Sequence, residues 1–504
     1  MMMDGLTLLL WTFGTVVVVA AASMLTYRSY RRWARRVRGP VQKALLRSGP
    51  PTALDGLVPD GDAARLLTLQ DGRHAFAARL ETARLAGRSL DLMYYLWYSD
   101  LTGWLLMAEL VRAADRGVRV RLLLDDVNVQ GLDRTFLALN QHPNIDIRLF
   151  NPVRSRSHAL RRIAETLLGL ARFNRRMHGK MWIADGAMAI IGGRNIGDTY
   201  FNAMEAGGTR SHDLDMAVTG PPVAEAETVF DAFWNLGLSL PIVTLWPKLR
   251  VSDENFRRRL RRRASNGAAR KYCRKMPRKV LSAPFAKGEV ALVADPPHKV
   301  YGHDPEAWLI HRLPTFLNSA RRQVRIVTPY FVPGQEGLRV LTDLARSGVQ
   351  VQVVTNALCS TDNLIVYGAY ARYRRALLRA GVELFEYGPA PDAGRRVLLH
   401  EKLFLVDGER ALVGSVNYDL RSAFMNTELA LYIDASDTVA ELMADFDTLI
   451  SPVAAFRLVP QGRKHVFEVQ RDGMPAVIAA DPYAGKMRRL RSWIVGHLPI
   501  QSYL

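Results

Sequence analysis

The sequence is poor in cysteine and lacks the common metal-binding motifs. Its two cysteines, Cys273 and Cys359, do not have the spacing of metal ligands. Two isolated cysteines argue against a disulfide framework and are compatible with a reducing compartment. The chain also contains neither an H-E-x-x-H segment nor a Cys/His cluster, so no sequence pattern predicts a metal centre.

Acidic residues are outnumbered by basic residues. The 504-residue chain has 48 Asp and Glu against 68 Lys and Arg, which gives a formal net charge of +20. Such a surplus suits a polyanionic partner, and either a nucleic acid or an anionic membrane surface would serve. Hydrophobic residues make up 49% of the chain, so a chain of this length can bury the cores of more than one domain.

Charged side chains are absent from Gly5 to Tyr27, and this segment is long enough to cross the roughly 30 Å hydrocarbon core of a bilayer. Six arginines follow directly, at Arg28, Arg31, Arg32, Arg35, Arg36 and Arg38. Because positive charge collects on the cytoplasmic side of a membrane, this order places the N-terminus outside and the rest of the chain in the cytoplasm. We therefore predict an N-terminal transmembrane anchor in residues 1–38, with the span over about 5–27.

A cleaved signal peptide is the alternative for this segment. The residues Ala20–Ser23 resemble a small-residue cleavage site. In a signal peptide, however, the positive charges precede the apolar run, whereas here they all follow it. The order of charges favours an uncleaved anchor.

The rest of the chain contains two similar halves, over residues 63–248 and 291–456. In each half a strand, a helix and a second strand follow in that order, which implies parallel strand pairing in a sheet covered by helices. These elements are expected at 89–97, 103–116 and 118–125 in the first half, and at 324–331, 338–347 and 348–355 in the second. We therefore predict an α/β fold made of two repeated α/β/α sandwich halves.

Three segments connect or flank these halves. Residues 39–62 contain proline and glycine and are expected to form a linker. Residues 249–290 are strongly basic and are expected to be either a solvated, partly mobile linker or a surface that lies on acidic lipid headgroups. In the tail, 457–504, the stretch Met487–Val495 predicts a basic amphipathic helix that rests on a membrane or packs on the body of the protein.

One pattern occurs in both halves. Residues His178–Asn195 and His400–Asn417 share the form H-x-K-x4-D-x6-G-[GS]-x-N and are identical at seven of eighteen positions. A lone H-x-K segment is weak evidence, but two copies inside a repeated unit indicate a common function. We interpret the two copies as the parts of one shared active site.

Side chains alternate along a strand, so the His and Lys of each copy project from the same face. This pairs His178 with Lys180, and His400 with Lys402. The Asp-Gly dipeptide that follows each pair is typical of a hairpin turn, so a second strand brings the chain back toward the His/Lys end. There it reaches the asparagine of the pattern. One imidazole, one ammonium and one amide therefore meet at the same edge of each half.

This inventory, present twice, suits phosphoryl transfer on a phosphodiester. A neutral histidine can attack phosphorus to form a covalent phosphohistidine, and a protonated histidine can donate its proton to the departing alkoxide. The lysines and asparagines can stabilise the non-bridging oxygens, and because the lysines take the place of a divalent cation, no metal or other cofactor is expected. The residues concerned are His178, Lys180, Asn195, His400, Lys402 and Asn417.

Each histidine also needs an acceptor for its other ring nitrogen. Asp213 and Glu428 are the candidates, because each opens an apolar, strand-like run downstream of a motif. Asp215 competes for the first of these roles. Asp185 and Asp407 complete the two motifs, and we expect them mainly to hold the hairpins and the interface between the halves.

The doubled H-x-K-x4-D motif resembles the signature of the phospholipase D superfamily, over roughly residues 65–455. Finer features are similar to bacterial cardiolipin synthases with a short N-terminal anchor, namely Tyr94–Trp97, Gly117–Asp126, Gly192–Asp198, Pro329–Pro333 and Gly414–Asp419. The resemblance implies two phospholipase D-like halves that form one active site. The catalytic residues that the resemblance implies are His178, Lys180, Asp185, His400, Lys402 and Asp407.

The resemblance further implies transfer of a phosphatidyl group from phosphatidylglycerol or phosphatidylethanolamine to a hydroxyl of phosphatidylglycerol. In the superfamily the first-motif histidine is often the nucleophile and the second the general acid, which here gives His178 and His400 these roles. The implied partners are phospholipid substrates and an anionic phospholipid membrane. The implied location is the bacterial inner membrane, with the catalytic body on the cytoplasmic side. The sequence points to no particular partner protein.

Two other activities and one non-enzymatic role share these features. A phospholipase D hydrolase would use water as the acceptor, and only exclusion of water from the second step separates it from a transferase. A nuclease would cleave nucleic-acid diesters with the same motif, but the expected anchor and the lack of a recognisable nucleic-acid-binding module argue against it. An inactive membrane-binding scaffold would be expected to have lost one motif, whereas both are intact here.

Overall fold

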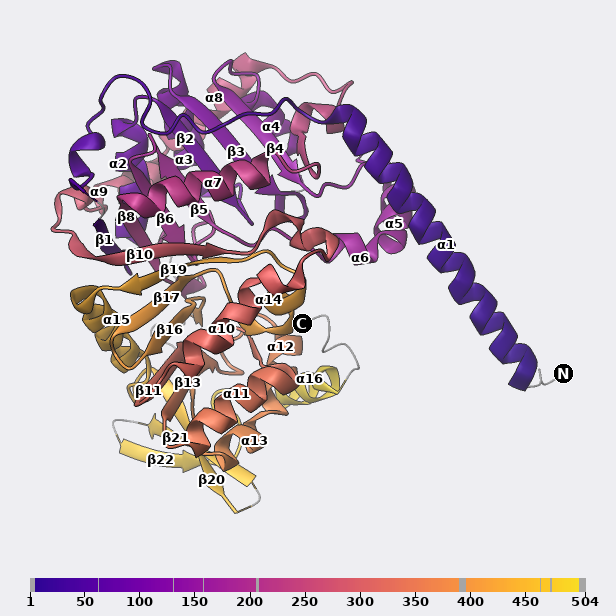
Figure 1. Ribbon diagram of the computed structural model, residues 1–504, viewed down its shortest axis with the longest axis vertical. Coiled ribbons are helices and arrows are strands. Elements are labelled where there is room, and N and C mark those ends of the chain that lie inside the picture. The colour runs from indigo at the N-terminus through magenta and orange to yellow at the C-terminus, as the bar shows by residue number, and fades with distance from the viewer. Residues whose placement is uncertain are drawn as a thin grey trace.

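A computed structural model describes residues 5–61, 63–129, 131–156, 158–204, 208–388, 396–462, 464–471 and 474–497, apart from the side chains of residues 5–10, 12–16 and 471. The chain folds into two halves that lie one above the other in Figure 1. Each half has a mixed sheet with helices on both faces, which confirms the prediction of two repeated α/β halves.

The first half is built on a sheet with the strand order β9-β4-β3-β2-β5-β6-β8-β1. Its strands are β1 (Ala64–Leu69), β2 (Ser89–Tyr94), β3 (Arg119–Asp125), β4 (Ile145–Phe150), β5 (Met181–Ala184), β6 (Met188–Gly192), β8 (Asp215–Thr219) and β9 (Ser239–Pro241). The helices include α2 (Gly72–Leu85), α3 (Leu101–Asp115), α4 (Asp133–Leu139), α5 (Ala159–Leu168), α6 (Leu170–Phe173) and α7 (Pro221–Trp234). The predicted strand–helix–strand unit is present as β2, α3 and β3, and the two strands pair in parallel.

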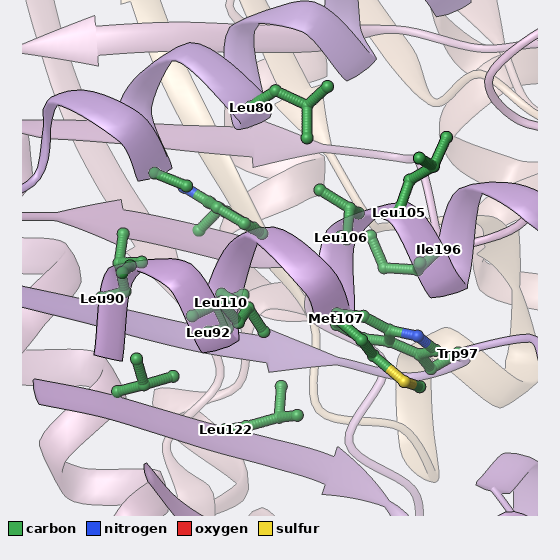
Figure 2. Close-up of a cluster of buried hydrophobic side chains, with 14 of the residues drawn as sticks. Leu80, Leu90, Leu92, Trp97, Leu105, Leu106, Met107, Leu110, Leu122 and Ile196 are labelled. Carbon is green, nitrogen blue, oxygen red and sulfur yellow. The ribbon is translucent and has the colours of Figure 1, made fainter. Parts of the chain in front are cut away.

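The core beneath α3 is formed by leucines that meet from a helix and two strands. Leu90 and Leu92 on β2 and Leu122 on β3 lie opposite Leu106 and Leu110, and all five are fully buried (Figure 2). The helical leucines are four residues apart, so they occupy the same face of α3. Loss of one such side chain typically costs about 2–5 kcal/mol, so this layer stabilises β2, which pairs with the motif strand β5.

The second half repeats this arrangement, with the order β19-β17-β16-β11-β13-β14-β20-β21-β22. Its strands are β11 (Gln323–Val327), β12 (Phe331–Val332), β13 (Gln350–Asn356), β14 (Glu383–Tyr387), β16 (Leu403–Val406), β17 (Arg410–Gly414), β18 (Tyr418–Asp419), β19 (Leu429–Asp434), β20 (Ala455–Gln461), β21 (Lys464–Arg471) and β22 (Met474–Ile478). The helices include α10 (Leu309–Asn318), α11 (Gly334–Arg346), α12 (Leu364–Ala371), α13 (Arg374–Arg379), α14 (Leu420–Phe424) and α15 (Ser436–Leu449). Strands β11, β13 and β14 pair in parallel, as β2, β3 and β4 do.

Strand β10 (Ala286–Ala294) joins the two sheets, because it pairs antiparallel with both β1 and β19. Eighteen of the described strands thereby form one continuous sheet. A hydrophobic core also crosses the junction, with Ile191 and Met216 from the first half and Val413 and Leu431 from the second. The two halves share buried apolar surface and therefore pack as one body.

The hairpins of the two motifs have the turns that the Asp-Gly dipeptides predict. Asp185 and Gly186 have φ values of 56° and 63°, and Asp407 and Gly408 have 57° and 71°. Positive φ at both central residues is what a tight type I′ hairpin turn requires, and Asp and Gly tolerate it best. The turns connect β5 to β6 and β16 to β17, which are paired as expected.

The basic segment 249–290 is not a solvated linker, and this part of the predicted domain division is wrong. It contains helices α8 (Asp253–Ala264) and α9 (Gly267–Arg274), which pack against α3 of the first half. Phe256, Leu260 and Tyr272 are buried there and join the first-half core. The arginines dominate the composition, but apolar residues at helical spacing give both helices a face that can be buried.

The tail is also folded. Strands β20, β21 and β22 extend the edge of the second-half sheet, and α16 (Lys486–Gly496) packs on α12. At this contact a Cβ atom on Gly496 would lie 2.5 Å from the carbonyl oxygen of Gly368, so only glycine allows the two helices to approach so closely. One face of α16 is therefore packed on the body of the protein.

The N-terminal helix α1 (Gly5–Val37) packs on the first half near Tyr30 and Ala34 and then projects away from the body (Figure 1). Within the part of the chain that the structure describes, no helix combines the length and the apolar content needed to cross a membrane. The span predicted over 5–27 depends largely on side chains outside the described part.

A test of the packed basic segment is the substitution Tyr272→Ala. The ring is 6% exposed, contacts Phe76, and its hydroxyl donates a hydrogen bond of 2.6 Å to the carbonyl of Phe201. We expect a loss of about 3 kcal/mol in the free energy of unfolding, measured by urea denaturation. Arg274→Ala, at an exposed position of the same helix, is the control and should change little. Equal, small effects of both changes would mean that the segment does not pack on the first half.

Candidate active site

The two H-x-K segments meet at the boundary between the halves, and each pairs with backbone of the opposite half. The amide of His178 donates to the carbonyl of Thr427 at 2.9 Å, and the amide of His400 donates to the carbonyl of His212 at 2.8 Å. Strand β7 (Arg210–His212) also pairs with β15 (Val397–Leu399), which directly precedes the second motif. The backbone thus brings the two motifs together.

The histidines exchange carboxylate partners across the same boundary. Nδ1 of His178 lies 2.8 Å from Oε2 of Glu428, and Nδ1 of His400 lies 2.6 Å from Oδ2 of Asp213. All four side chains are buried. Both carboxylates were predicted from the sequence. Each one, however, contacts the histidine of the opposite half and not the histidine of the motif that precedes it in sequence. Neither half alone therefore contains a complete His–carboxylate pair.

Asp215, the competing candidate, has a different position. Its carboxylate binds the guanidinium of Arg79 at 2.9 Å and lies 3.5 Å from that of Arg194. All three side chains are almost fully buried. Asp215 therefore forms part of an ion-pair cluster inside the first half.

The lysines and asparagines of the motifs are buried around the histidines. Nζ of Lys180 donates to the carbonyl of His178 at 2.5 Å, and Nζ of Lys402 lies 3.1 Å from Nδ1 of His400 and donates to its carbonyl. Burial lowers the pKa of both lysines. Two ammonium groups buried near one point make a strong site for an anion.

Each motif asparagine has spare hydrogen-bonding capacity. Oδ1 of Asn195 and Oδ1 of Asn417 are buried and have no hydrogen-bond partner among the described residues. Nδ2 of Asn195 donates to the hydroxyl of Tyr200 at 3.2 Å. That hydroxyl can donate equally well to a reversed amide, which would leave the NH₂ group for a phosphate oxygen. The asparagines are thus suited to bind non-bridging oxygens.

Two tyrosines pack against the histidines in equivalent positions. Tyr95 meets the His178 ring edge-on, with ring centres 4.8 Å apart, and Tyr200 meets the His400 ring in the same way at 5.1 Å. Tyr95 lies in the segment Tyr94–Trp97 and Tyr200 follows the segment Gly192–Asp198, but their position beside the imidazoles was not predicted. A packed aromatic ring limits rotation of the imidazole and excludes water from it.

Asp185 and Asp407 lie at the turns, at the opposite end of β5 and β16 from the histidines. The Asp185 carboxylate accepts hydrogen bonds from the amides of Gly87, Arg88 and Ser89. Asp407 accepts from the amides of Arg321, Arg322 and Gln323. Each Asp therefore fixes its hairpin to the start of a neighbouring strand in its own half. The expected contribution to the interface between the halves is wrong.

The variable Gly/Ser position of the shared pattern has a chemical consequence. A Cβ atom on Gly193 would lie 2.1 Å from Oδ1 of Asp213, so only glycine leaves room for that carboxylate. The equivalent residue is Ser415, whose hydroxyl donates to Oε2 of Glu428 at 2.5 Å. Ser422 donates to Oε1 of the same carboxylate at 2.9 Å. Ser415 therefore helps to hold the Glu428–His178 pair. This role was not predicted from the sequence.

Burial controls the charge state of the pairs. It lowers the pKa of His178 to about 4, and burial together with the charge of Lys402 lowers the pKa of His400. Burial opposes ionisation of the two carboxyls, but the charge of the bonded histidine brings the pKa of Asp213 and of Glu428 to about 2. At neutral pH the empty site therefore holds ionised carboxylates and neutral imidazoles.

A second ionic cluster lies directly behind the His400 segment. Nε2 of His212 is 3.0 Å from Oε2 of Glu401 and 3.5 Å from Oδ2 of Asp445. Among the described residues this is the one group whose ligand atoms are close enough to share a metal ion. Burial opposes protonation of His212, but its ion pairs with Asp445 and Glu401 raise its pKa to about 10. The cluster ties β7 to α15 and to the second motif by ion pairing.

Comparisons with known proteins agree with this geometry. The sequence matches the family described as "Cardiolipin synthase, PLD-like domain" over residues 79–234 and 313–450. Cardiolipin synthase C of Escherichia coli (strain K12) is 36% identical over 400 residues, which cover 75% of this chain and 83% of that protein. The chain belongs to the phospholipase D-like cardiolipin synthase family. It is therefore a phospholipase D-type phosphatidyltransferase.

Two more distant proteins are similar to this chain over most of its length. A cardiolipin synthase of Geobacillus sp. (strain WCH70) is 27% identical over 431 residues, covering 84% of this chain and 73% of that protein. Phosphatidylserine synthase of Haemophilus influenzae Rd KW20 has the same fold, with a TM-score of 0.53 at 15% identity. The match covers 78% of this chain and 87% of that one.

The exchanged carboxylate can be tested with Glu428→Gln. We expect the rate of phosphatidyl transfer to fall by about 10²–10⁴-fold, because an amide keeps the shape of the side chain but cannot stabilise a positively charged imidazole. The rate is measured by product formation from labelled phospholipid. Glu409→Gln, at an exposed ion pair with Arg322, is the matched control and should retain its rate. Activity of Glu428→Gln close to that of the control would show that the pair does not support the chemistry.

Proposed function

We propose that the chain makes cardiolipin by transferring a phosphatidyl group from phosphatidylglycerol or phosphatidylethanolamine to a hydroxyl of a second phosphatidylglycerol. The observation that carries the proposal is the exchange of carboxylates between the halves, which creates one site with two equivalent histidines. A double displacement at phosphorus requires two such groups, one to form the covalent bond and one to move the proton.

In the first step, Nε2 of His178 attacks the phosphorus of the donor lipid. Glu428 holds Nδ1, so Nε2 is the nitrogen available for attack. The bond from phosphorus to the headgroup oxygen breaks, and His400 donates a proton to that oxygen. Glycerol leaves if the donor is phosphatidylglycerol, and ethanolamine leaves if it is phosphatidylethanolamine. The phosphatidyl group remains on His178.

In the second step, a hydroxyl of phosphatidylglycerol attacks the phosphohistidine. His400 accepts the hydroxyl proton, the phosphorus–nitrogen bond breaks, and His178 is released as a neutral imidazole. Lys180 and Lys402 stabilise the non-bridging oxygens throughout, as Asn195 and Asn417 do. The lysines provide the positive charge that a divalent cation supplies in other phosphoryl-transfer enzymes.

The charge state of His178 suits a nucleophile, and the assignment of this role to His178 rather than to His400 follows the family resemblance. A nucleophilic imidazole must be neutral, and burial keeps the pKa of His178 at about 4. A bound phosphodiester anion would favour protonation of the neighbouring His400, as the general acid requires.

The proposal includes attachment to the bacterial inner membrane through a single N-terminal span, with the catalytic body in the cytoplasm. Support comes from the uncharged sequence Gly5–Tyr27 and the six arginines after it. Both substrates of the proposed reaction are membrane lipids, so attachment keeps the enzyme where they are.

The reaction is tested with the purified full-length protein in detergent–lipid mixtures. Labelled phosphatidylglycerol is supplied with and without phosphatidylethanolamine, and products are separated by mass. We expect cardiolipin and released glycerol or ethanolamine, and no detectable turnover by His178→Ala or His400→Ala, each with an unchanged thermal unfolding midpoint. Phosphatidic acid as the main product would make the enzyme a hydrolase. No change in either lipid would favour a nucleic-acid substrate instead.

The pH dependence of kcat/KM should follow the two histidines. His178 must be neutral, and with its pKa at about 4 this condition holds above roughly pH 5. His400 must be protonated, and its lowered pKa means that the proton is lost as the pH rises. We therefore expect the rate to be highest on the acid side of neutrality and to decline toward about pH 8. A rate that increases over this range would contradict the assigned charge states.

A further inference from the structure

Helix α5 exposes a stripe of apolar side chains to solvent. Leu160 is 82% exposed, and Ile163 and Leu167 are also more than half exposed. Their spacing of three and four residues places them on one side of the helix. No residue of α5 is buried. Its apolar stripe is therefore available to another apolar phase.

Helix α16 exposes a second stripe. Met487, Leu490, Trp493 and Ile494 are exposed, with Trp493 at 63%, while the opposite face packs on α12. The exposed side chains again have helical spacing and include an aromatic ring of the kind that favours a membrane–water interface. The helix is thus fixed to the body on one side and apolar on the other.

Both helices are connected to the active site. After α5 the chain forms the short helix α6, which ends at Phe173. His178 follows five residues later. Arg421 of α14 donates to the carbonyl of Asn174 at 3.3 Å, and Ser422 of the same helix binds Glu428. The apolar stripe of α5 therefore lies on the segment that leads into the first motif.

Helix α16 is linked to the second motif in a similar way. Arg488 donates to the carbonyls of Leu358 and Thr361, both at 2.6 Å, in the loop after β13. Asn356, at the start of this loop, forms two hydrogen bonds with the backbone of Leu399, the residue before His400. Figure 1 shows α5, α6 and α16 on the same side of the body, the side from which α1 projects.

The charges around the stripes are positive. Arg161 and Arg162 are exposed on α5, and Lys486 and Arg491 are exposed on α16, which contains no acidic residue. The acidic residue of α5, Glu165, is neutralised by Arg172 at 3.3 Å and by two backbone amides. Apolar side chains between basic ones match a bilayer surface that contains anionic lipids.

A hollow next to α5 has the same character. It has a volume of about 1020 Å³, lies between α1 and α5, and is lined by Arg154, Arg161 and Lys248 together with apolar side chains such as Leu25 and Leu249. Basic groups beside apolar ones suit the phosphate and upper acyl chain of one lipid. The hollow therefore continues the surface from α5 to the helix that is expected to enter the membrane.

We infer that the exposed stripes of α5 and α16 form a membrane-docking surface, which inserts into an anionic phospholipid bilayer. This surface is independent of the anchor and orients the catalytic body so that lipids enter the site from the bilayer. The inference rests on the proposed function, because it concerns how lipid substrates reach that site.

Immersion can be measured without reference to activity. In the full chain with Cys273→Ser and Cys359→Ser, a spin label is placed at Leu167→Cys, at Leu490→Cys or at the control Val477→Cys. Val477 is 64% exposed on β22, at the far end of the second half (Figure 1). The protein is reconstituted into vesicles of phosphatidylglycerol and phosphatidylcholine. Accessibility of each label to oxygen and to a water-soluble nickel chelate is then compared.

Labels at positions 167 and 490 should be more accessible to oxygen than to the nickel chelate, while the label at 477 should show the reverse. The difference should decrease in vesicles of phosphatidylcholine alone, since the basic residues then lose their anionic partner. Aqueous accessibility at both test positions, equal to that at the control, would overturn the inference.

A second measurement links the surface to turnover. The double substitution Ile163→Ser/Leu167→Ser is compared with Val453→Ser/Val477→Ser, which removes two equally exposed apolar side chains elsewhere. The readout is the ratio of the rate with vesicles to the rate with monodisperse short-chain phosphatidylglycerol. We expect this ratio to fall about ten-fold for the α5 variant and to stay constant for the control. Equal ratios in both variants would also overturn the inference.

The two proposals fail separately. If the labels are immersed but the product is not cardiolipin, the docking surface stands and the proposed function is wrong. If cardiolipin forms while the labels remain in water, the proposed function stands and the docking surface is wrong.

Discussion

The hydrogen bonds from each histidine to a carboxylate of the opposite half are the interaction on which this enzyme depends. His178 is held by Glu428 and His400 by Asp213, at 2.8 and 2.6 Å. Each bond fixes the ring so that Nε2 is the nitrogen free for chemistry. Because the partners come from different halves, separating the halves by even an ångström or two would break both pairs at once.

That requirement explains the extensive junction between the halves. Strand β10 pairs with β1 and β19, so the two sheets are continuous, and one apolar core crosses the boundary. The cluster of His212, Glu401 and Asp445 adds ion pairs between the halves close to the second motif. Such a junction gives the two halves less conformational freedom than a hinge would. In return, it holds the four side chains of the two His–carboxylate pairs in position without further movement.

The electrostatics of the site follow from its burial. Two lysines, two carboxylates and two neutral imidazoles are withdrawn from water, and burial lowers the pKa of both lysines. An anionic phosphodiester, such as the one in the headgroup of a membrane lipid, favours the charged form of the lysines. The substrate is also an amphiphile, so its acyl chains need an apolar environment while its phosphate occupies the site. The exposed stripes of α5 and α16 provide a contact with such an environment near the site.

Local features of the chain were sufficient for much of this description. The doubled motif, the Asp-Gly hairpin turns and the strand–helix–strand units each depend on residues a few positions apart, where side-chain chemistry and backbone preference act directly. The sequence therefore determined the repeated α/β fold and the reaction class, and it predicted the residues of the candidate site. In residues 249–290 apolar residues are few and arginines dominate the composition. The buried face formed by Phe256, Leu260 and Tyr272 was therefore not predicted.

Only the tertiary structure decided which carboxylate serves which histidine. The bonded pairs are 250 and 187 residues apart, and in sequence each carboxylate lies closer to the motif that it does not serve. The same holds for Tyr95 and Tyr200, for the contact of Ser415 with Glu428, and for the placement of α5 and α16 on one side of the body. These relations arise from packing of the two halves around a shared core, and no local pattern of residues encodes the direction in which one half meets the other.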